Sequence, residues 1–227
     1  MTHTLPAAVL FDMDGTIVDT EPYWLRAERE LVGSFGQSWT TQDGFALVGS
    51  GLALSAQFLQ KRGVDLHEDD IIDRLTARVL QQAMEHIPWR PGAVELLRAL
   101  NEAQIPTALV TMSMRPLAEH IATSLDFTAF QAIVTGGDVE NPKPHPEPYL
   151  RAAETLNVQI TDCLAIEDSP PGLASATASG AAVVGVPAHV PLTESPTYTL
   201  WDTLAGRSIA DLTNIFLGRT VTGSVQA

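Results

Sequence analysis

The feature that most limits the possible folds is a series of short, continuously apolar runs, most of which end at a polar or small residue. Five runs and a weaker sixth occupy residues 8–11, 107–110, 132–134, 164–166, 182–186 and 198–201. Runs this short, without polar alternation, are typical of strands buried on both faces of a sheet. Amphipathic patterns with helical spacing, such as Leu117, Ile121 and Leu125, lie between them. This alternation predicts an α/β fold built on a parallel sheet.

The stretch between the first run and the second is too long for one crossover helix. Residues from about 20 to 87 show only helical patterns, which include a long apolar stripe through Ile71, Leu75 and Val79. Proline-containing segments bound this stretch on both sides, and such segments suit hinges between packed units. We therefore expect a Rossmann-like core of residues 1–18 and 89–218, flanked by helices. An all-helical domain would be inserted at residues 19–88, and residues 219–227 would form a C-terminal tail.

The composition is strongly acidic, with 13 basic and 27 acidic residues, a formal net charge of −14 and a pI of about 4.6. Nucleic acids and anionic membranes normally bind surfaces rich in lysine and arginine. We therefore expect neither as a partner. The overall field would also repel a phosphorylated ligand. Any phosphate site therefore needs a local positive charge from a metal ion, a lysine or backbone N–H groups.

The sequence also indicates the cellular compartment in which the protein works. It lacks a run of about 18 apolar residues, which a membrane span would need, and its N-terminus lacks the basic flank and apolar stretch of a signal peptide. The single cysteine, Cys163, cannot form an internal disulfide, which suits a reducing compartment. We expect a cytoplasmic protein that acts as a monomer.

The most informative motif follows the first apolar run, where residues 11–16 read Phe-Asp-Met-Asp-Gly-Thr. The carboxylates of Asp12 and Asp14 point to the same side while the chain stays extended, and Gly15 permits a sharp turn. Two nearby carboxylates disfavour double ionisation. One acid can therefore be an ionised nucleophile or metal ligand while the other holds a proton. The alternative interpretation is an acidic loop that only closes a strand.

Two further stretches supply groups suited to an anion. Thr111 follows the second run, and a hydroxyl with the exposed N–H groups beyond a strand end suits a phosphate. Taken alone, this threonine is more simply a helix cap. Lys143 lies between two prolines, and an ammonium held there can neutralise a phosphoryl group. A lysine without such neighbours usually lies in solvent.

A second acidic pair, Glu167 and Asp168, follows the fourth run and precedes Ser169. Carboxylates at this strand end, near Asp12 across the sheet, would form an all-oxygen site of the kind that Mg²⁺ prefers.

Residues 12–16 resemble the first motif of the haloacid dehalogenase superfamily, and the stretches at Thr111, Lys143 and Glu167–Asp168 resemble its second, third and fourth motifs, in the same order. The resemblance implies that Asp12 attacks phosphorus to give an aspartyl phosphate. It implies that Asp14 protonates the leaving oxygen and then deprotonates the water that cleaves the intermediate. This is covalent catalysis assisted by general acid–base catalysis.

The resemblance also implies the ligands of the bound groups. Mg²⁺ would be held by Asp12, the backbone carbonyl of Asp14 and Asp168, with Glu167 acting through water and Ser169 beside it. The phosphoryl group would be bound by Thr111, by Met112 and Ser113 and by Lys143. The sequence 112–114, Met-Ser-Met, departs from the Asn, Gly or Ser that commonly follows the threonine. We therefore expect backbone donors at Met112 rather than a side-chain contact.

The helical insertion resembles the cap of the β-phosphoglucomutase and phosphoglycolate-phosphatase branch, and residues 19–24 look closest to its sugar and hexitol phosphatases. Two features differ from the mutase. Trp24 stands where the mutase has a histidine, and the cap loop 49–52 has no basic residue to hold a second phosphate. Both favour a Mg²⁺-dependent phosphatase acting on a small phosphate monoester, such as a sugar phosphate. We expect Trp24 to pack in the core rather than stack on a sugar.

Two alternatives remain open. Transfer of the β-phosphoglucomutase type would use the same residues. A phospho-accepting binding module would be phosphorylated on Asp12 without turnover, but the cap and the Asp14-Gly15-Thr16 sequence favour turnover. Dehalogenation needs neither Mg²⁺ nor the second acid, so we do not expect it.

Overall fold

A six-stranded parallel sheet forms the centre of the molecule in the computed structural model, which describes residues 5–48 and 51–223. The strands, in chain order, are β1 (Ala8–Phe11), β2 (Thr107–Val110), β3 (Ala132–Val134), β4 (Cys163–Glu167), β5 (Ala182–Gly185) and β6 (Thr199–Leu200). Their order in the sheet is β3-β2-β1-β4-β5-β6, and every neighbouring pair is parallel. The predicted α/β fold is confirmed, with a strand at each of the six apolar runs.

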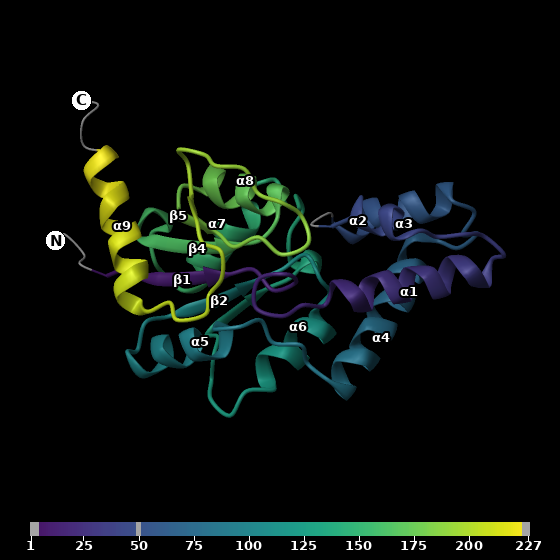
Figure 1. The fold of residues 1–227 in the computed structure, drawn as a ribbon, viewed down its shortest axis with the longest axis horizontal. Coiled ribbons are helices and arrows are strands. Elements are labelled where there is room, and N and C mark those ends of the chain that lie inside the picture. Colours follow the sequence, from purple (N-terminus) through teal and green to yellow (C-terminus); the bar gives the residue numbers. More distant parts are fainter. Residues whose placement is uncertain (1–4, 49–50, 224–227) are drawn as a thin grey trace.

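Helices cover both faces of the sheet (Figure 1). They are α5 (Ala93–Glu102), α6 (Arg115–Thr123), α7 (Glu147–Thr155), α8 (Pro170–Ser179) and α9 (Ile209–Gly223), with 3-10 turns η1 (Gly136–Asp138) and η2 (Ile160–Asp162). Alternate residues of β1 belong to different apolar clusters. Val9 and Phe11 pack with α5, α6 and α9, whereas Ala8 and Leu10 pack with α7 and α8. This two-sided burial explains why the strands are apolar throughout.

The insertion between β1 and β2 is helical, as predicted, and lies at one end of the core (Figure 1, right). It consists of α1 (Glu21–Ser34), α2 (Thr41–Phe45), α3 (Leu52–Lys61) and α4 (Glu68–Glu85). The two chain segments that join it to the core run side by side: the Asp19 N–H donates to the Pro88 carbonyl at 2.8 Å, and Val18 forms an antiparallel bridge with Trp89. The insertion therefore leaves and re-enters the core at one place, beyond the carboxyl end of β1, in the position of a cap.

The C-terminal helix α9 extends to Gly223. It therefore passes the core boundary that was expected at residue 218. The rest of the expected tail, residues 224–227, lies outside the described residues, as do Gly49 and Ser50 of the cap loop. In the part of the chain that is described, no helix has the length and apolar character needed to cross a membrane.

Gly92, which precedes α5, allows a test of this packing. Gly92 and Gly206 both have left-handed backbones, with φ of +84° and +74°. A Cβ at Gly92 would lie 2.2 Å from the Leu204 carbonyl, whereas a Cβ at Gly206 would meet nothing within 4 Å. We expect Gly206→Ala to lower the free energy of unfolding by about 1 kcal/mol, from backbone strain. Gly92→Ala should lower it by about 3 kcal/mol, because overpacking adds to that strain. Equal losses in urea denaturation would contradict this account.

Candidate active site

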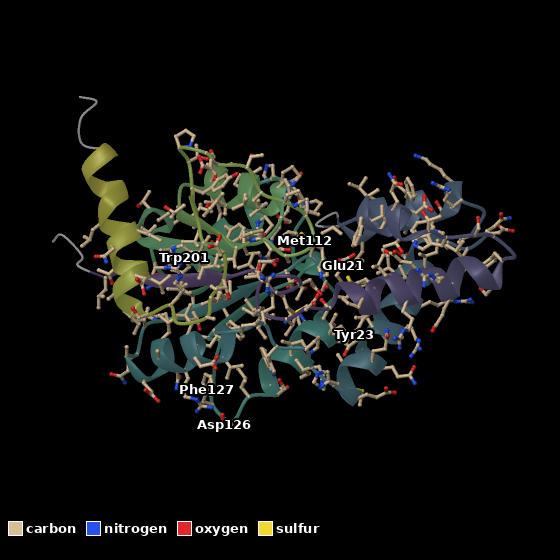
Figure 2. The ribbon with its side chains drawn as sticks, in the orientation of Figure 1. Glu21, Tyr23, Met112, Asp126, Phe127 and Trp201 are labelled. Atoms are coloured by element: carbon tan, nitrogen blue, oxygen red, sulfur yellow. The ribbon has the colours of Figure 1, made fainter. Side chains whose placement is uncertain are left out.

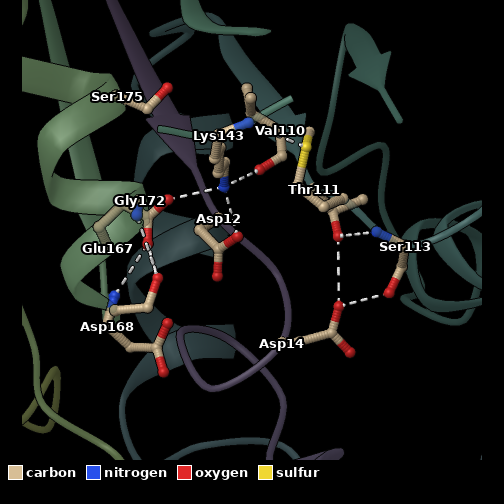
Figure 3. Close-up of polar contacts among 12 residues, drawn as sticks. Asp12, Asp14, Val110, Thr111, Ser113, Lys143, Glu167, Asp168, Gly172 and Ser175 are labelled. Atoms are coloured by element: carbon tan, nitrogen blue, oxygen red, sulfur yellow. Dashed lines mark hydrogen bonds and ion pairs between the residues drawn. The ribbon is translucent and has the colours of Figure 1, made fainter. Parts of the chain in front are cut away.

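The carboxyl ends of three neighbouring strands bring the predicted site residues together. Phe11 at the end of β1 is in register with Leu109 of β2 on one side and Ile166 of β4 on the other. The residues that follow these strands therefore meet at the edge of the sheet that faces the insertion, where open α/β sheets place their ligands (Figure 3). Asp12 is anchored there by its N–H, which donates to the Ile166 carbonyl at 3.0 Å.

Lys143 is buried at the centre of the site. Its ammonium donates to Asp12 Oδ1 at 2.7 Å, to Glu167 Oε1 at 2.6 Å and to the Val110 carbonyl at 2.9 Å, so all three of its donors are used. Burial alone would lower the pKa of Lys143, but the charges of Asp12 and Glu167 outweigh it and raise that pKa above its usual value. The lysine predicted to be a local positive charge is therefore held charged beside Asp12.

Glu167 is also held by the hydroxyls of Tyr149 and Ser169. The hydroxyl of Tyr149, a fully buried residue of α7, donates to Glu167 Oε1 at 2.7 Å. The hydroxyl of Ser169 donates to Glu167 Oε2 at 3.3 Å and accepts from the Gly172 N–H at 3.2 Å, which caps α8. Helical periodicity can place Tyr149 on the buried face of α7, but it cannot show where the hydroxyl points.

Asp12, Glu167 and Asp168 form a cluster that suits a divalent cation. Each offers a carboxylate oxygen, and these atoms lie within 4.8 Å of one another. Burial, then the charge of Glu167, raises the pKa of Asp12 to about 7, although Lys143 opposes the rise. Burial, then the charge of Asp12, raises the pKa of Asp168 as well. Asp12 Oδ2 is buried and has no hydrogen-bond partner among the described residues. An oxygen-ligated Mg²⁺ would fit this donor set and offset its excess negative charge.

Asp168, which directly follows β4, lies so close to the first motif that position 15 must be a glycine. Gly15 has φ of +83°, and a Cβ there would lie 2.0 Å from Asp168 Oδ2. The sharp turn predicted at Gly15 is confirmed, and it also makes room for the Asp168 carboxylate.

Asp14 lies apart from this acidic cluster and accepts four hydrogen bonds. Thr111 Oγ1 and Ser113 Oγ donate to its Oδ2 at 3.2 and 2.7 Å (Figure 3). Trp24 Nε1 donates to its Oδ1 at 3.1 Å, and Thr20 Oγ1 donates to the same oxygen. Trp24 packs in the core cluster, as expected, but it also orients Asp14 and lines the cavity beside it. The expectation that it does not stack on a sugar therefore stays a prediction. The contacts from Thr20 and Trp24 were not predicted, because they depend on where α1 begins relative to the turn at Gly15.

The remaining predicted phosphate-binding residues lie close to Lys143 and Asp14. The Ser113 N–H donates to Thr111 Oγ1 at 3.0 Å, so this backbone donor already has a partner. Met112 Sδ accepts from the Lys143 N–H at 3.4 Å and thus supports the loop that carries the lysine.

A cavity of about 710 Å³, counting its open mouth, lies between the sheet edge and the insertion. Figure 2 labels Met112 and Glu21 where the core and the insertion meet. The core side of the lining is Asp12, Asp14, Thr111, Met112, Ser113, Lys143, Asp168 and Ser169. The cap side is Glu21, Trp24, Glu28, Gly44, Leu47, Val48, Leu52, Ser55 and Leu75. The structure therefore gathers the predicted site residues around one open cavity, apart from Glu167, which does not line it.

Residues 6–180 match a family model described as a hydrolase, haloacid dehalogenase-like hydrolase. The chain belongs to the haloacid dehalogenase-like hydrolases. The family match confirms the resemblance based on four motifs and establishes the protein as a hydrolase of this family.

Two phosphatases and one crystal structure are similar to this chain over most of its length. Fructose-1-phosphate phosphatase YqaB of Escherichia coli (strain K12) is 32% identical over 189 residues, which cover 79% of this chain and 96% of that protein. Hexitol phosphatase A of the same organism is 32% identical and covers 80% and 84%. The crystal structure of CbbY from Rhodobacter sphaeroides in complex with phosphate is 28% identical, with a TM-score of 0.81, and covers 92% of this chain and 99% of that chain.

The buried ammonium of this hydrolase allows a test of how the site is held together. Lys143→Met would leave Asp12 and Glu167 as buried carboxylates without a counter-charge. We expect it to lower the free energy of unfolding by about 3–5 kcal/mol in urea denaturation. Lys61→Met, at the exposed end of α3, should change it by less than about 0.5 kcal/mol. Similar small losses for both variants would show that the lysine does not stabilise the acidic cluster.

Proposed function

We propose that this hydrolase is a Mg²⁺-dependent phosphatase that cleaves a small phosphate monoester, a sugar phosphate or similar metabolite, through an aspartyl phosphate on Asp12. The proposal rests on how the two carboxylate oxygens of Asp12 are hydrogen-bonded. One oxygen is bonded to Lys143, while the other is buried without a hydrogen-bond partner among the described residues, in a residue that lines the cavity. An oxygen so placed is available for a metal ion or a phosphorus atom.

The proposed reaction has two steps. An Asp12 oxygen bonds to phosphorus as the bond to the ester oxygen breaks, and Asp14 gives its proton to that departing oxygen. Water then attacks the aspartyl phosphate, Asp14 takes a proton from the water, and the bond between phosphorus and Asp12 breaks to release phosphate. The second step restores both acids. The four hydrogen bonds to Asp14 hold its carboxyl group in position for both proton transfers.

The surrounding residues stabilise the negative charge on the phosphoryl group. Lys143 places an ammonium beside Asp12, and the hydroxyls of Thr111 and Ser113 can turn from Asp14 toward phosphoryl oxygens. Asp12, Asp168 and the backbone carbonyl of Asp14 would hold Mg²⁺, which supplies a positive charge for the same oxygens.

We propose residues 19–88 as a cap that closes over the substrate and excludes water from the aspartyl phosphate. The cap supplies about half of the lining of the cavity. Two relatives whose names give sugar or hexitol phosphates as substrates support a similar ester here. The buried, unpaired Cys163 fits the reducing environment of the cytoplasm, and we propose a monomer because core and cap of one chain together line the site.

Replacing the nucleophile is the most direct test. We expect Asp12→Asn to lower phosphate release from sugar phosphates by at least about 10³-fold, because a neutral amide cannot form the phosphoenzyme. The melting temperature should not fall, since the change removes one charge from a crowded acidic cluster. Normal turnover by this variant would refute the nucleophile assignment. Supplying a hexose 1-phosphate and detecting the 6-phosphate instead of free phosphate would favour mutase chemistry.

Removal of the metal tests the acidic cluster separately. We expect EDTA to stop phosphate release and excess Mg²⁺ to restore it. Mg²⁺ should also raise the melting temperature, because a ligand that binds only the folded state adds about 2.7 kcal/mol of stability at 100 times its Kd. Asp168→Asn should lose this thermal shift, whereas Asp202→Asn at an exposed position should keep it. Full turnover without divalent ions would contradict the proposal.

A further inference from the structure

The segment that returns from the cap carries an arginine, Arg90, at the hinge between cap and core. Its backbone N–H donates to the Ile17 carbonyl at 2.9 Å. The preceding residue, Trp89, forms the antiparallel bridge with Val18. Arg90 is therefore fixed by its backbone beside the end of the first motif, where it is half-buried.

The guanidinium of Arg90 joins two segments that are distant in sequence. Its Nη1 donates to the Gly15 carbonyl, and its Nη2 donates to the Pro187 carbonyl at 3.0 Å. Pro187 follows Val186, whose N–H donates at 2.7 Å to the carbonyl of Glu167, the last residue of β4. The N–H groups of a planar guanidinium form a rigid fork, so one side chain can hold two acceptors in a defined relative position. Arg90 thus ties the cap hinge to the turn after β1 and to the segment after β5.

The Gly15 carbonyl belongs to a closed turn that contains Asp14. The N–H groups of residues 16–18 all donate to the Met13 carbonyl, at 3.0–3.2 Å, and the Gly15 N–H donates to the Val18 carbonyl at 2.7 Å. The backbone from Met13 to Val18 is therefore one hydrogen-bonded unit. A contact that holds this unit at Gly15 also fixes the direction of the neighbouring Asp14 carbonyl, which is one of the three protein oxygens proposed to hold Mg²⁺.

The charge of Arg90 acts on the same site. Asp168 lies directly over Gly15, since a Cβ on that glycine would be 2.0 Å from Asp168 Oδ2. Burial raises the pKa of Asp168, and the positive charges of Lys143 and Arg90 oppose the rise. The two carbonyls bound by the guanidinium are neutral, so these bonds leave its charge uncompensated. Arg90 can therefore offset part of the excess negative charge of the acidic cluster.

We propose that Arg90 is a positioning residue for the metal site: its guanidinium holds the turn 13–18 and the segment after β5 against the cap hinge, so that the Mg²⁺ ligands keep their arrangement while the cap opens and closes. Arg90 does not line the active-site cavity, so it acts through the residues that it holds. The proposal rests on the Mg²⁺-dependent phosphatase function and adds a link between the hinge and the ligands. Residues that support metal ligands in this way typically change metal affinity or activity by about 10–100-fold.

The first test measures phosphate release from a sugar phosphate over a range of Mg²⁺ concentrations. We expect Arg90→Ala to raise the Mg²⁺ concentration at half-maximal rate about tenfold, and to lower kcat at saturating Mg²⁺ about tenfold. KM for the ester should change less than about threefold, because the groups proposed to bind the phosphoryl oxygens are unaltered. A smaller fraction of folded enzyme would lower the rate equally at every Mg²⁺ concentration, so it would not shift the half-maximal point.

Arg90→Lys separates the charge from the geometry, because an ammonium keeps the charge but lacks the planar fork. We expect it to raise the half-maximal Mg²⁺ concentration at least about threefold. Arg98→Ala is the matched control, since Arg98 is a half-buried arginine of α5, the helix after the hinge, and binds Asp126 at 2.6 Å. It should leave the Mg²⁺ dependence unchanged. The proposal is refuted if Arg90→Lys keeps the native Mg²⁺ dependence, or if Arg90→Ala behaves like Arg98→Ala.

Guanidinium ions in solution provide a second readout. Arg90 borders a cavity of about 810 Å³, counting its open mouth, that is also lined by Asp19, Trp89 and His189. A small cation can therefore reach the place of the missing side chain in Arg90→Ala. We expect about 20–50 mM guanidinium chloride, well below denaturing concentrations, to raise phosphate release by this variant several-fold over matched sodium chloride. An equal rise with methylammonium chloride, or in Arg98→Ala, would contradict the proposed geometry.

Mg²⁺ binding measured without substrate separates failure of this role from failure of the phosphatase. Calorimetry should show about tenfold weaker Mg²⁺ binding by Arg90→Ala than by the native protein or Arg98→Ala. If no sugar phosphate is hydrolysed while this difference in binding remains, the phosphatase is refuted and the positioning role is supported. If phosphate is released and all three proteins bind Mg²⁺ equally, the positioning role alone is refuted.

Discussion

The structure depends on the contact between one ammonium and two carboxylates in a nearly water-free place. Lys143 binds Asp12 and Glu167, which end neighbouring strands, and the Val110 carbonyl at the end of a third. Burying charged groups is costly unless they are paired and hydrogen-bonded. This pairing therefore holds three strand ends in one arrangement. It also leaves the cluster with more negative than positive charge, which is the condition for recruiting a divalent cation.

The same arrangement resolves the conflict between an acidic protein and an anionic substrate. The formal net charge of −14 repels phosphate at long range, but screening confines that field to roughly 8 Å at physiological ionic strength. Within the site, a lysine and a metal ion would dominate because the surroundings exclude water. The acidic character continues on the cap side of the cavity, at Glu21 and Glu28. Burial raises the pKa of Glu21 to about 8 and that of Glu28 to about 7, so these two residues add less negative charge than exposed carboxylates would.

Core and cap are joined physically through the first turn of α1. Thr20 and Trp24 reach back to Asp14, while Glu28 extends the same helix into the cap. A helix is rigid over these few turns, so the position of the proposed proton donor and the position of the cap wall depend on each other. Closure of the cap would therefore set the orientation of Asp14 as well as exclude water.

Sequence alone determined the α/β class, the six strand positions, the helical insertion and the family. Each of these depends on local periodicity or on motifs whose order along the chain is visible in one dimension. The sequence could also indicate that Asp12 and Asp168 meet, because parallel strands align their carboxyl ends, whereas the place of Lys143 in the site followed from the family resemblance.

Only the tertiary structure decided which atoms are paired. It assigned the Tyr149 hydroxyl to Glu167 and the Trp24 indole to Asp14, and it placed Glu28 and Ser55 at one cavity wall. Helical spacing placed Trp24 and Glu28 on a packed face but could not distinguish a packed core from a lined cavity. That distinction depends on how helices distant in sequence lie relative to one another, to within a few ångströms, and no local pattern carries this information.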